Sequence, residues 1–242
     1  MTRASLRGAF VAALLAVVTG VAGVAAAKPE EKQAPAAKEA AAPDTWYAQR
    51  VTHGDAPVAV EHFWSKGRKL RAEMVVQGMP VLTLVNGDRY TIIDATNLVG
   101  VAIRRAPEAV AADAKQPKER PFGREGDDLL KLGGELVRSD HHGGQPCRVL
   151  RHTDDRGRRE VWVTDDKRKL PLKLEFFARE SGTHTISDYI DWLSGMELPD
   201  AFFEPDPRVQ LEAIEYADYV KRSGEGPVGP APVLFSPLLH GK

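Results

Sequence analysis

The sequence predicts a mainly β protein built on a single highly curved antiparallel sheet of about eleven strands, with one short helical segment. Apolar and polar residues alternate through most of the chain after Trp46, and turn dipeptides recur at short intervals between the alternating runs. One long connection, 106–132, separates the two groups of strands. Because curling removes exposed edges, one curved sheet is favoured over two separate sandwiches.

The first group of strands extends from Trp46 to Arg105. Lys66-Gly67, Gln77-Gly78 and Asn86-Gly87-Asp88 interrupt the apolar pattern, and Asn-Gly between apolar runs is a strong hairpin signal. In Lys69–Val76, apolar residues alternate with mostly charged ones, which is typical of an antiparallel sheet covered on one face.

The connection 106–132 contains Pro107, Pro117 and Pro121 and is rich in Ala, Lys and Glu. We expect one short helix over 125–132, ended by Gly133-Gly134. A connection of this length is typical of a lid, a binding loop or a solvated linker. Both the lid and the linker interpretation remain open on these residues.

The second group of predicted strands covers Glu135–Asp140, Cys147–His152, Arg159–Thr164, Leu170–Phe177 and Thr183–Trp192. The alternation is clearest in Leu170–Phe177. Beyond Glu212 we expect a C-terminal extension, 213–242, with a helical stretch near Ile214–Arg222 and irregular structure from Pro227 to Pro237.

The N-terminus predicts export. Arg3 and Arg7 precede an apolar run, Ala9–Val24, and Ala25-Ala26-Ala27 supplies the small residues of a cleavage site, so 1–27 is interpreted as a signal peptide. A membrane anchor is the alternative, but the run is short for a spanning helix. Residues 28–44 contain no large apolar side chain and are interpreted as a flexible linker.

Charge and cysteine content exclude several classes of protein. The formal net charge of −1 is not that of a nucleic-acid-binding domain. Cys147 is the only cysteine, so no internal disulfide forms, and we expect its thiol to lie buried as a small apolar group.

No residue pattern indicates catalysis, a metal or a cofactor. His141 and His142 are adjacent, so in a strand they point to opposite faces, and no further ligand lies at a familiar spacing. The pairs Asp154-Asp155 and Asp165-Asp166 fall at predicted turns, where solvated carboxylates are common. We therefore expect a binding protein and not an enzyme, with no metal site and no cofactor.

A family resemblance rests on the segment Arg159–Leu211. It contains Leu170-Pro171-Leu172-Lys173-Leu174-Glu175, then Tyr189 and Trp192, then Leu198-Pro199-Asp200 followed by Phe203 and Pro205. This segment resembles the closing half of the periplasmic lipoprotein-carrier (LolA-like) family. Phe63–Glu73 is similar to a hairpin of the broader lipoprotein-sorting group, in which Arg71 matches one of two arginines typical of the carriers.

The resemblance implies that residues 45–212 form a LolA-like half-barrel, a half-open β-barrel whose mouth is capped by the helical segment. It implies a periplasmic, monomeric carrier that binds lipid acyl chains or lipoproteins on the concave apolar face. A periplasmic sensor or adaptor that binds a membrane-anchored regulatory protein is the alternative. The residues expected to line the apolar site are Leu70, Met74, Leu84, Ile92, Leu172, Leu174 and Phe176, and those expected to form the lid are Leu129, Leu130 and Leu132.

Overall fold

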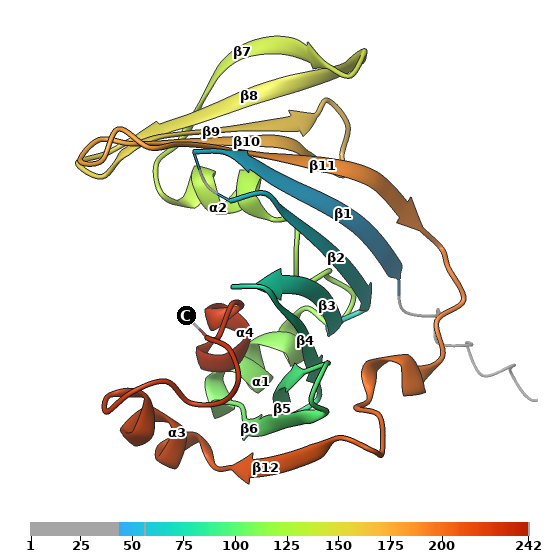
Figure 1. Cartoon of the computed structure of the whole chain (residues 1–242). Coiled ribbons are helices and arrows are strands. Elements are labelled where there is room, and N and C mark those ends of the chain that lie inside the picture. The colour runs from blue at the N-terminus through green and yellow to red at the C-terminus, as the bar shows by residue number, and fades with distance from the viewer. Residues whose placement is uncertain (1–43, 56, 242) are drawn as a thin grey trace, which may run out of the picture. The chain divides into compact units, whose positions relative to one another are not determined.

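Twelve strands form one sheet in the computed structural model, which describes residues 44–55 and 57–241 (Figure 1). The expected signal peptide, and the expected linker up to residue 43, lie outside the described residues. The strands are β1 Thr45–Gly54, β2 Ala59–Lys66, β3 Lys69–Val76, β4 Met79–Asn86, β5 Arg89–Asp94, β6 Val99–Arg104, β7 Glu135–His142, β8 Gln145–Thr153, β9 Gly157–Thr164, β10 Pro171–Ala178, β11 His184–Ser194 and β12 Gln210–Ile214.

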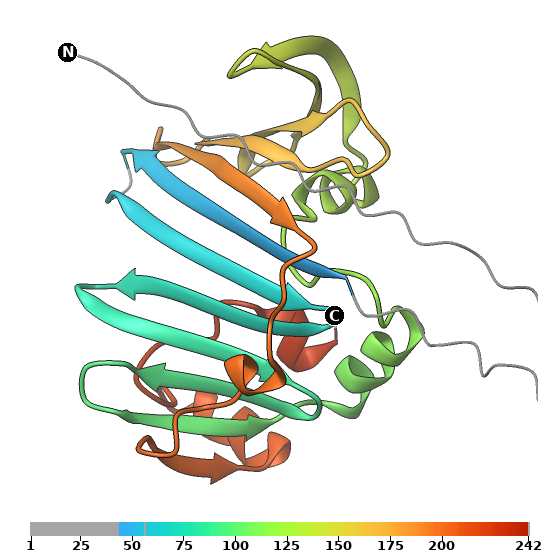
Figure 2. The same cartoon turned by 90° about the vertical axis from the view of Figure 1, so that its right-hand side faces the viewer.

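The strand order is β12-β6-β5-β4-β3-β2-β1-β11-β10-β9-β8-β7. Strand β1 joins the two halves, since it pairs with β2 on one side and with β11 on the other. Every pair is antiparallel except β12 with β6, which is parallel. The predicted mainly β, highly curved sheet is confirmed, and β12 is the additional strand. Figure 2 shows β12 at one edge of the sheet and β7 at the other.

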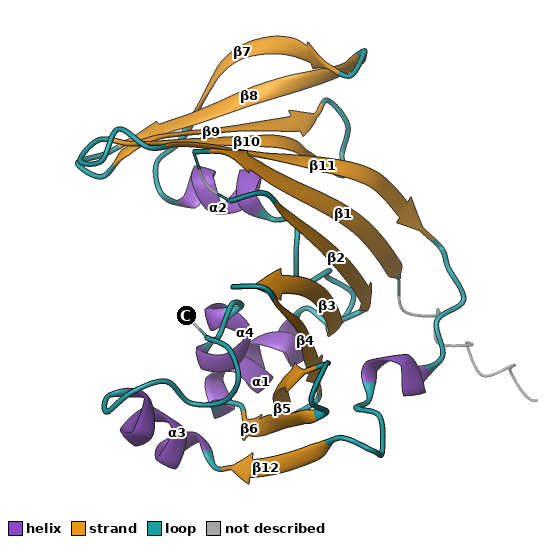
Figure 3. Cartoon of the chain, viewed as in Figure 1, coloured by secondary structure: helices purple, strands orange, loops and turns teal. Residues whose placement is uncertain are grey.

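The described residues also form short helices, most of them on the concave side of the sheet (Figure 3). The predicted helix after Arg124 is confirmed as α2, whereas α1 and α4 were not predicted. A one-turn 3₁₀ helix, η1, lies on the outer side of the sheet, beside β3 and β4. The helices are α1 Pro107–Lys115, α2 Glu125–Lys131, η1 Asp200–Phe203, α3 Tyr216–Ser223 and α4 Ser236–His240.

Turn chemistry and strand register agree in the first half of the sheet. Gly87 has a φ of +56°, as the Asn-Gly turn between β4 and β5 requires. Leu70, Val85, Tyr90 and Ile103 lie directly opposite one another on β3 to β6, so they point to the same face, and all four are buried. This row forms part of the main core on the concave face.

The C-terminal extension completes that core. Val228, Ala231, Leu238 and Leu239 are buried in the same cluster as Leu70, and Phe235 packs against it. Burying these apolar side chains stabilises the fold by roughly 25 cal/mol per Å² of apolar surface. The extension and the half-barrel therefore share one core and one sheet.

Arg105 fixes the extension to the sheet. Its side chain is 1% exposed and lies 2.8 Å from the carboxylate of Asp113 on α1. It donates hydrogen bonds to the carbonyl oxygens of Leu238, at 2.5 Å, and Gly87, at 2.6 Å. The main-chain N–H of Ala106 also donates to the carbonyl of Leu239. A buried guanidinium with several acceptors is stable only while all its partners stay in place.

The connection 106–124 is packed onto the sheet through charged and aromatic contacts. Arg68 on the β2–β3 turn forms an ion pair with Asp113 at 2.7 Å. Phe122 stacks on Phe63 with ring centroids 5.4 Å apart. Through these contacts the connection packs against the sheet.

We predict that Arg105→Met lowers the free energy of unfolding by about 2–4 kcal/mol, because it leaves the carbonyl groups of Leu238 and Gly87 without this donor and removes one of the two cationic partners of Asp113. Urea denaturation measures this change. The neighbouring Arg104 is the matched control, since its side chain is 49% exposed and its ion pairs lie at the surface. Arg104→Met should cost less than about 1 kcal/mol. Equal losses for both variants would contradict the role given to Arg105.

A second prediction concerns the packing of α2. A Cβ at Gly126 would lie 2.7 Å from Cγ1 of Val163 on β9, so the helix approaches the sheet closely there. Gly126→Ala should destabilise the protein by about 1–3 kcal/mol despite the better helix propensity of alanine. The control is Gly226→Ala, where a Cβ meets nothing within 4 Å and the change should stay within about 0.5 kcal/mol. An unchanged unfolding midpoint for Gly126→Ala would show that α2 is not held tightly.

Candidate functional site

Two segments of the chain, the C-terminal extension and α2, cover parts of the concave face. The C-terminal extension covers the face of β2 to β6, where the predicted lining residues Leu70, Met74 and Ile92 lie buried in the main core. Helix α2 covers part of β8 and β9. Open space on this face lies along the two flanks of α2.

Leu84 does not share this face. It lies opposite Arg71 on β3 and Thr91 on β5, and its neighbour Val85 points into the main core. Leu84 is buried on the outer side, where β4 contacts the η1 segment. Successive residues of a strand point to opposite faces, so adjacent buried residues cannot both line the concavity.

Leu172 also lies on the outer side, although it alternates with Leu174 in the sequence. The register between β9 and β10 shifts between Pro171 and Lys173, and this irregularity turns Leu172 away. It packs with Cys147, Val149 and Trp162 in a small separate cluster.

Leu174 and Phe176 meet α2 in a pocket of about 290 Å³, which we call the β10 pocket. Its apolar walls come from α2 and from the consecutive, paired strands β9 and β10. Arg159 lies over the ring of Phe176, with 5.9 Å between the guanidinium carbon and the ring centroid. The β10 pocket is lined by Glu125, Asp128, Leu129, Leu132, Arg159, Glu160, Val161, Leu174, Glu175, Phe176, Thr185 and Ser187.

The three leucines expected to form a lid occupy different environments. Leu129 is 4% exposed and packs with Leu150, Val161 and Val163 beneath α2. Leu132 is 53% exposed and lines the β10 pocket. Leu130 is 38% exposed and faces the other flank of the helix. Leu129 therefore anchors α2, and the other two remain available at its flanks.

On that other flank lies a pocket of about 510 Å³, which we call the turn pocket. Leu130, Leu136, Leu150 and Val163 provide its apolar surface, and the turn between β9 and β10 forms its polar rim. The complete lining is Leu130, Leu136, Arg148, Leu150, Val163, Thr164, Asp165, Asp166, Lys167 and Lys169.

A partly buried cluster of charged side chains lies beside the β10 pocket. Arg50 donates two hydrogen bonds to Glu61, at 2.5 and 2.8 Å, and its guanidinium lies 3.5 Å from Glu125. Burial opposes the charge of Arg50, but the hydrogen bond to Glu61 and the nearby negative groups raise its pKa overall, so it stays charged. Tyr189 donates to Glu125 at 2.6 Å, and burial and the Glu125 charge raise the pKa of Tyr189 well above its ordinary value.

Glu125 and Asp128 line both the β10 pocket and a smaller hollow of about 230 Å³ that also contacts Arg50, Phe63 and Phe235. The two spaces therefore adjoin at the first turn of α2. Arg50, Glu61 and Glu125 come from three elements and follow no motif, so this charged cluster was not predictable from the sequence.

An aromatic cluster continues along the same face. Trp192 stacks on Phe122 with centroids 5.7 Å apart, and Arg120 lies over the rings of Trp46 and Trp192 at 5.2 and 5.3 Å. Burial lowers the pKa of Arg120. Cation–π contacts of this kind hold the 116–124 connection on the sheet.

Arg71 lies on the outer side, away from both pockets. It donates to Glu73 at 2.6 and 2.8 Å and to the carbonyl of Phe202, and its guanidinium lies 4.5 Å from the Phe202 ring centroid. Its contacts connect β3 to the η1 segment.

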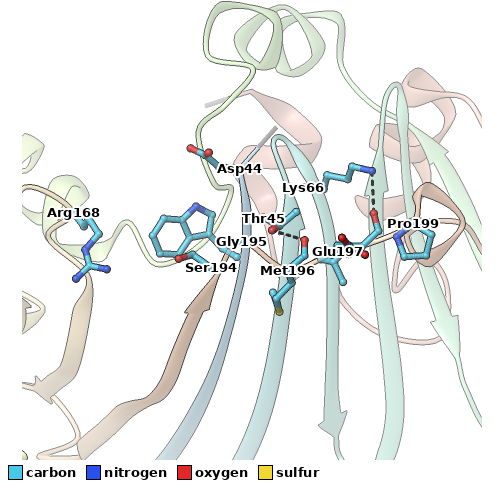
Figure 4. A pocket seen from close by; sticks show the side chains of 11 residues that line it. Asp44, Thr45, Lys66, Arg168, Ser194, Gly195, Met196, Glu197 and Pro199 are labelled. Carbon is cyan, nitrogen blue, oxygen red and sulfur yellow. Dashed lines mark hydrogen bonds between the residues drawn. The ribbon is translucent and has the colours of Figure 1, made fainter. Parts of the chain in front are cut away.

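A wider hollow of about 1000 Å³ lies where β1 begins and β11 ends (Figure 4). Most of its lining comes from 194–199, which comprises the last residue of β11 and the connection to η1. Thr45 donates to the carbonyl of Met196 at 2.8 Å, and Lys66 donates to the carbonyl of Leu198 at 3.0 Å. None of the site residues predicted from the sequence lies in this hollow.

The other residues singled out in the sequence have local structural roles. Cys147 is buried, and burial raises the pKa of its thiol. Asp154 accepts hydrogen bonds from the main-chain N–H groups of Arg156 and Gly157, and Asp166 accepts them from Arg168 and Lys169. Both carboxylates thus stabilise turns.

In residues 44–55 and 57–241, no three His, Cys, Asp or Glu side chains are grouped so as to hold a metal ion. Among the described helices, none has the length and apolar character needed to cross a membrane.

No protein-family model matches the chain, and no curated protein matches its sequence. An uncharacterized conserved protein from Thermus thermophilus is 12% identical with a TM-score of 0.49, over 70% of this chain and 90% of that one. The Pseudomonas aeruginosa MucA/MucB complex gives 16% and 0.43, over 71% and 59%. A putative outer membrane lipoprotein-sorting protein domain from Vibrio parahaemolyticus gives 14% and 0.29, over 67% and 89%. MucB and the lipoprotein-sorting domain have the LolA-like fold.

Proposed function

We propose that this protein is an exported, periplasmic, non-enzymatic carrier that holds an acyl chain of a lipid or lipoprotein in the β10 pocket. The observation that supports this proposal is the convergence of Leu129, Leu174 and Phe176 on one pocket from α2 and β10. Ligand pockets are typically concave and mostly apolar with a few polar groups.

The charges around the β10 pocket favour an uncharged chain. Glu125 and Asp128 lie on its α2 side, and Arg159 is paired with Asp154 at 2.8 Å. A carboxylate ligand would meet two carboxylates of α2 at short range, which is unfavourable. The ester-linked or amide-linked acyl chain of a lipid or lipoprotein has no such charge.

The C-terminal extension limits how much of the concave face a ligand can reach. Phe235 packs edge-on against Phe63, with centroids 6.1 Å apart, and its N–H donates to the Tyr90 hydroxyl at 3.1 Å. Burial raises the pKa of Tyr90 to about 12, so the hydroxyl stays protonated and neutral near pH 7. In this proposal, a chain longer than the β10 pocket reaches Leu70, Met74 and Ile92 only by displacing the extension.

An adaptor that binds a membrane-anchored regulatory protein is the second candidate. The observation that favours it is a pair of exposed valines on the outer side of the sheet, Val60 at 40% and Val75 at 56%. They line a hollow of about 410 Å³ with Pro80 and Leu82. Exposed apolar surface of this kind marks many protein contact sites.

Crosslinking in the native envelope distinguishes the two candidates. A photoreactive residue at position 132, at the mouth of the β10 pocket, should capture lipid or diverse lipoproteins if the protein is a carrier. The same residue at position 75 should capture one recurring membrane protein if it is an adaptor. Capture of a single protein at position 75 with no lipid at 132 would overturn the carrier proposal.

We predict that Leu174→Ala weakens the binding of a fluorescent acyl-chain ester about tenfold, because the truncation removes contact equivalent to roughly two methylenes, about 1.6 kcal/mol. Leu172→Ala is the matched control. Leu172 lies two residues away on the same strand but packs on the outer side. It should lower stability with little effect on the dissociation constant, whereas an equal loss of binding in both variants would contradict the assigned pocket.

A further inference from the structure

The two flanks of α2 differ in charge. The β10 pocket has the carboxylates of Glu125 and Asp128 on its helix side. The turn pocket has instead a rim of positive side chains, Arg148, Lys167 and Lys169. The same helix therefore separates an acidic apolar pocket from a basic one.

The positive charge of the turn pocket is only partly neutralised within the described residues. Its two acidic members already have partners, since Asp165 lies 2.5 Å from Arg148 and Asp166 lies 2.7 Å from Arg168. Lys167 and Lys169 form no ion pair with any described carboxylate. Both ammonium groups are on the exposed turn and remain available to a ligand.

The backbone holds this turn in a defined shape. Asp166 accepts hydrogen bonds from the N–H groups of Arg168 and Lys169, and Thr164 accepts one from the N–H of Leu170. Lys169 has a φ of +47°, an unusual value for a residue other than glycine. The two lysines are thus attached to an ordered turn at the rim of the pocket.

The pocket floor is apolar and partly open. Leu150 and Val163 form its buried base, and Leu136 and Leu130 are 52% and 38% exposed at its mouth. An aliphatic chain placed here would cover these exposed leucines, which is favourable in proportion to the apolar area removed from water. Its polar end would then lie near the lysines.

We infer that the turn pocket is a second binding site, specific for single-chain amphiphiles with an anionic head group. The alkyl chain packs on Leu130, Leu136 and Leu150, and the head group pairs with Lys167 and Lys169. The inference goes beyond the proposed function, because it concerns the opposite flank of α2 and a charged class of ligand.

Isothermal titration calorimetry with dodecanoate, below its micelle concentration, tests this site. Lys167→Gln/Lys169→Gln should weaken dodecanoate binding about three- to tenfold, the range expected for the loss of two exposed ion pairs. The control Lys115→Gln/Lys118→Gln removes the same charge from two exposed lysines, one at the last residue of α1 and one shortly after it. It should change binding by less than about twofold. Added salt should weaken binding to the wild type more than to the turn variant.

Leu136→Gln provides a test that is independent of charge. The side chain is half exposed, so the fold should tolerate the change, and dodecanoate binding should weaken. Dodecyltrimethylammonium, which has the same chain and the opposite charge, should bind this site at least about tenfold more weakly than dodecanoate. Leu174→Ala should leave dodecanoate binding unchanged, because Leu174 belongs to the β10 pocket.

Three results would overturn the inference: no dodecanoate binding by the wild type, equal losses in the two lysine pairs, or a loss caused by Leu174→Ala in place of Lys167→Gln/Lys169→Gln. The first two do not bear on the ester probe in the β10 pocket, whereas the third would place dodecanoate in that pocket. Conversely, if the ester probe does not bind the β10 pocket, the dodecanoate result for the turn pocket is unaffected.

Discussion

The structure depends on one constraint, which is that a curved sheet that does not close must bury its concave apolar face in another way. The row from Leu70 to Ile103 presents large apolar side chains to the concavity, and exposing them to water would cost roughly 1.5–3 kcal/mol for each side chain. The chain avoids this exposure by covering the face with its own segments. The 106–132 connection and the C-terminal extension both return to the concave side and cover it.

These covers are held by few, strong polar anchors. Arg105 binds the extension, Arg68 binds α1, and Arg120 holds the connection between Trp46 and Trp192. In each case a long cationic side chain from one element reaches acceptors or aromatic rings on another. Apolar burial supplies most of the stabilisation, and these contacts define where each cover lies.

Much of the fold was predictable from the sequence. The Asn86-Gly87 turn and the alternation in Lys69–Val76 predicted the hairpins, since both signals are local. The parallel pairing of β12 was not predictable, because it depends on contacts with β6, more than a hundred residues earlier in the chain. Helix α4 was also missed, since its five residues begin with Ser236-Pro237 and are stabilised mainly by the core.

The candidate site was less predictable, for a physical reason. Alternation identifies buried positions but does not say which face a residue takes once both faces are covered. Leu84 and Leu172 have the expected apolar character, but they lie on the outer side, one beneath the η1 segment and the other after a register shift. Leu174 and Phe176 do lie beside Leu129 in the structure, because the register of β10 is regular again after the shift.

The position of β1 has a consequence for the order in which the chain folds. This strand is the first described one, but its partner β11 is separated from it by about 130 residues, as in the Thr52–Ser187 pair. The first half of the sheet likewise acquires its last strand and part of its core only from 210–241. Non-local pairings of this kind slow folding, because a long loop must close before its contacts are gained. The concave core therefore stays incomplete during folding until residues 210–241 have joined the sheet.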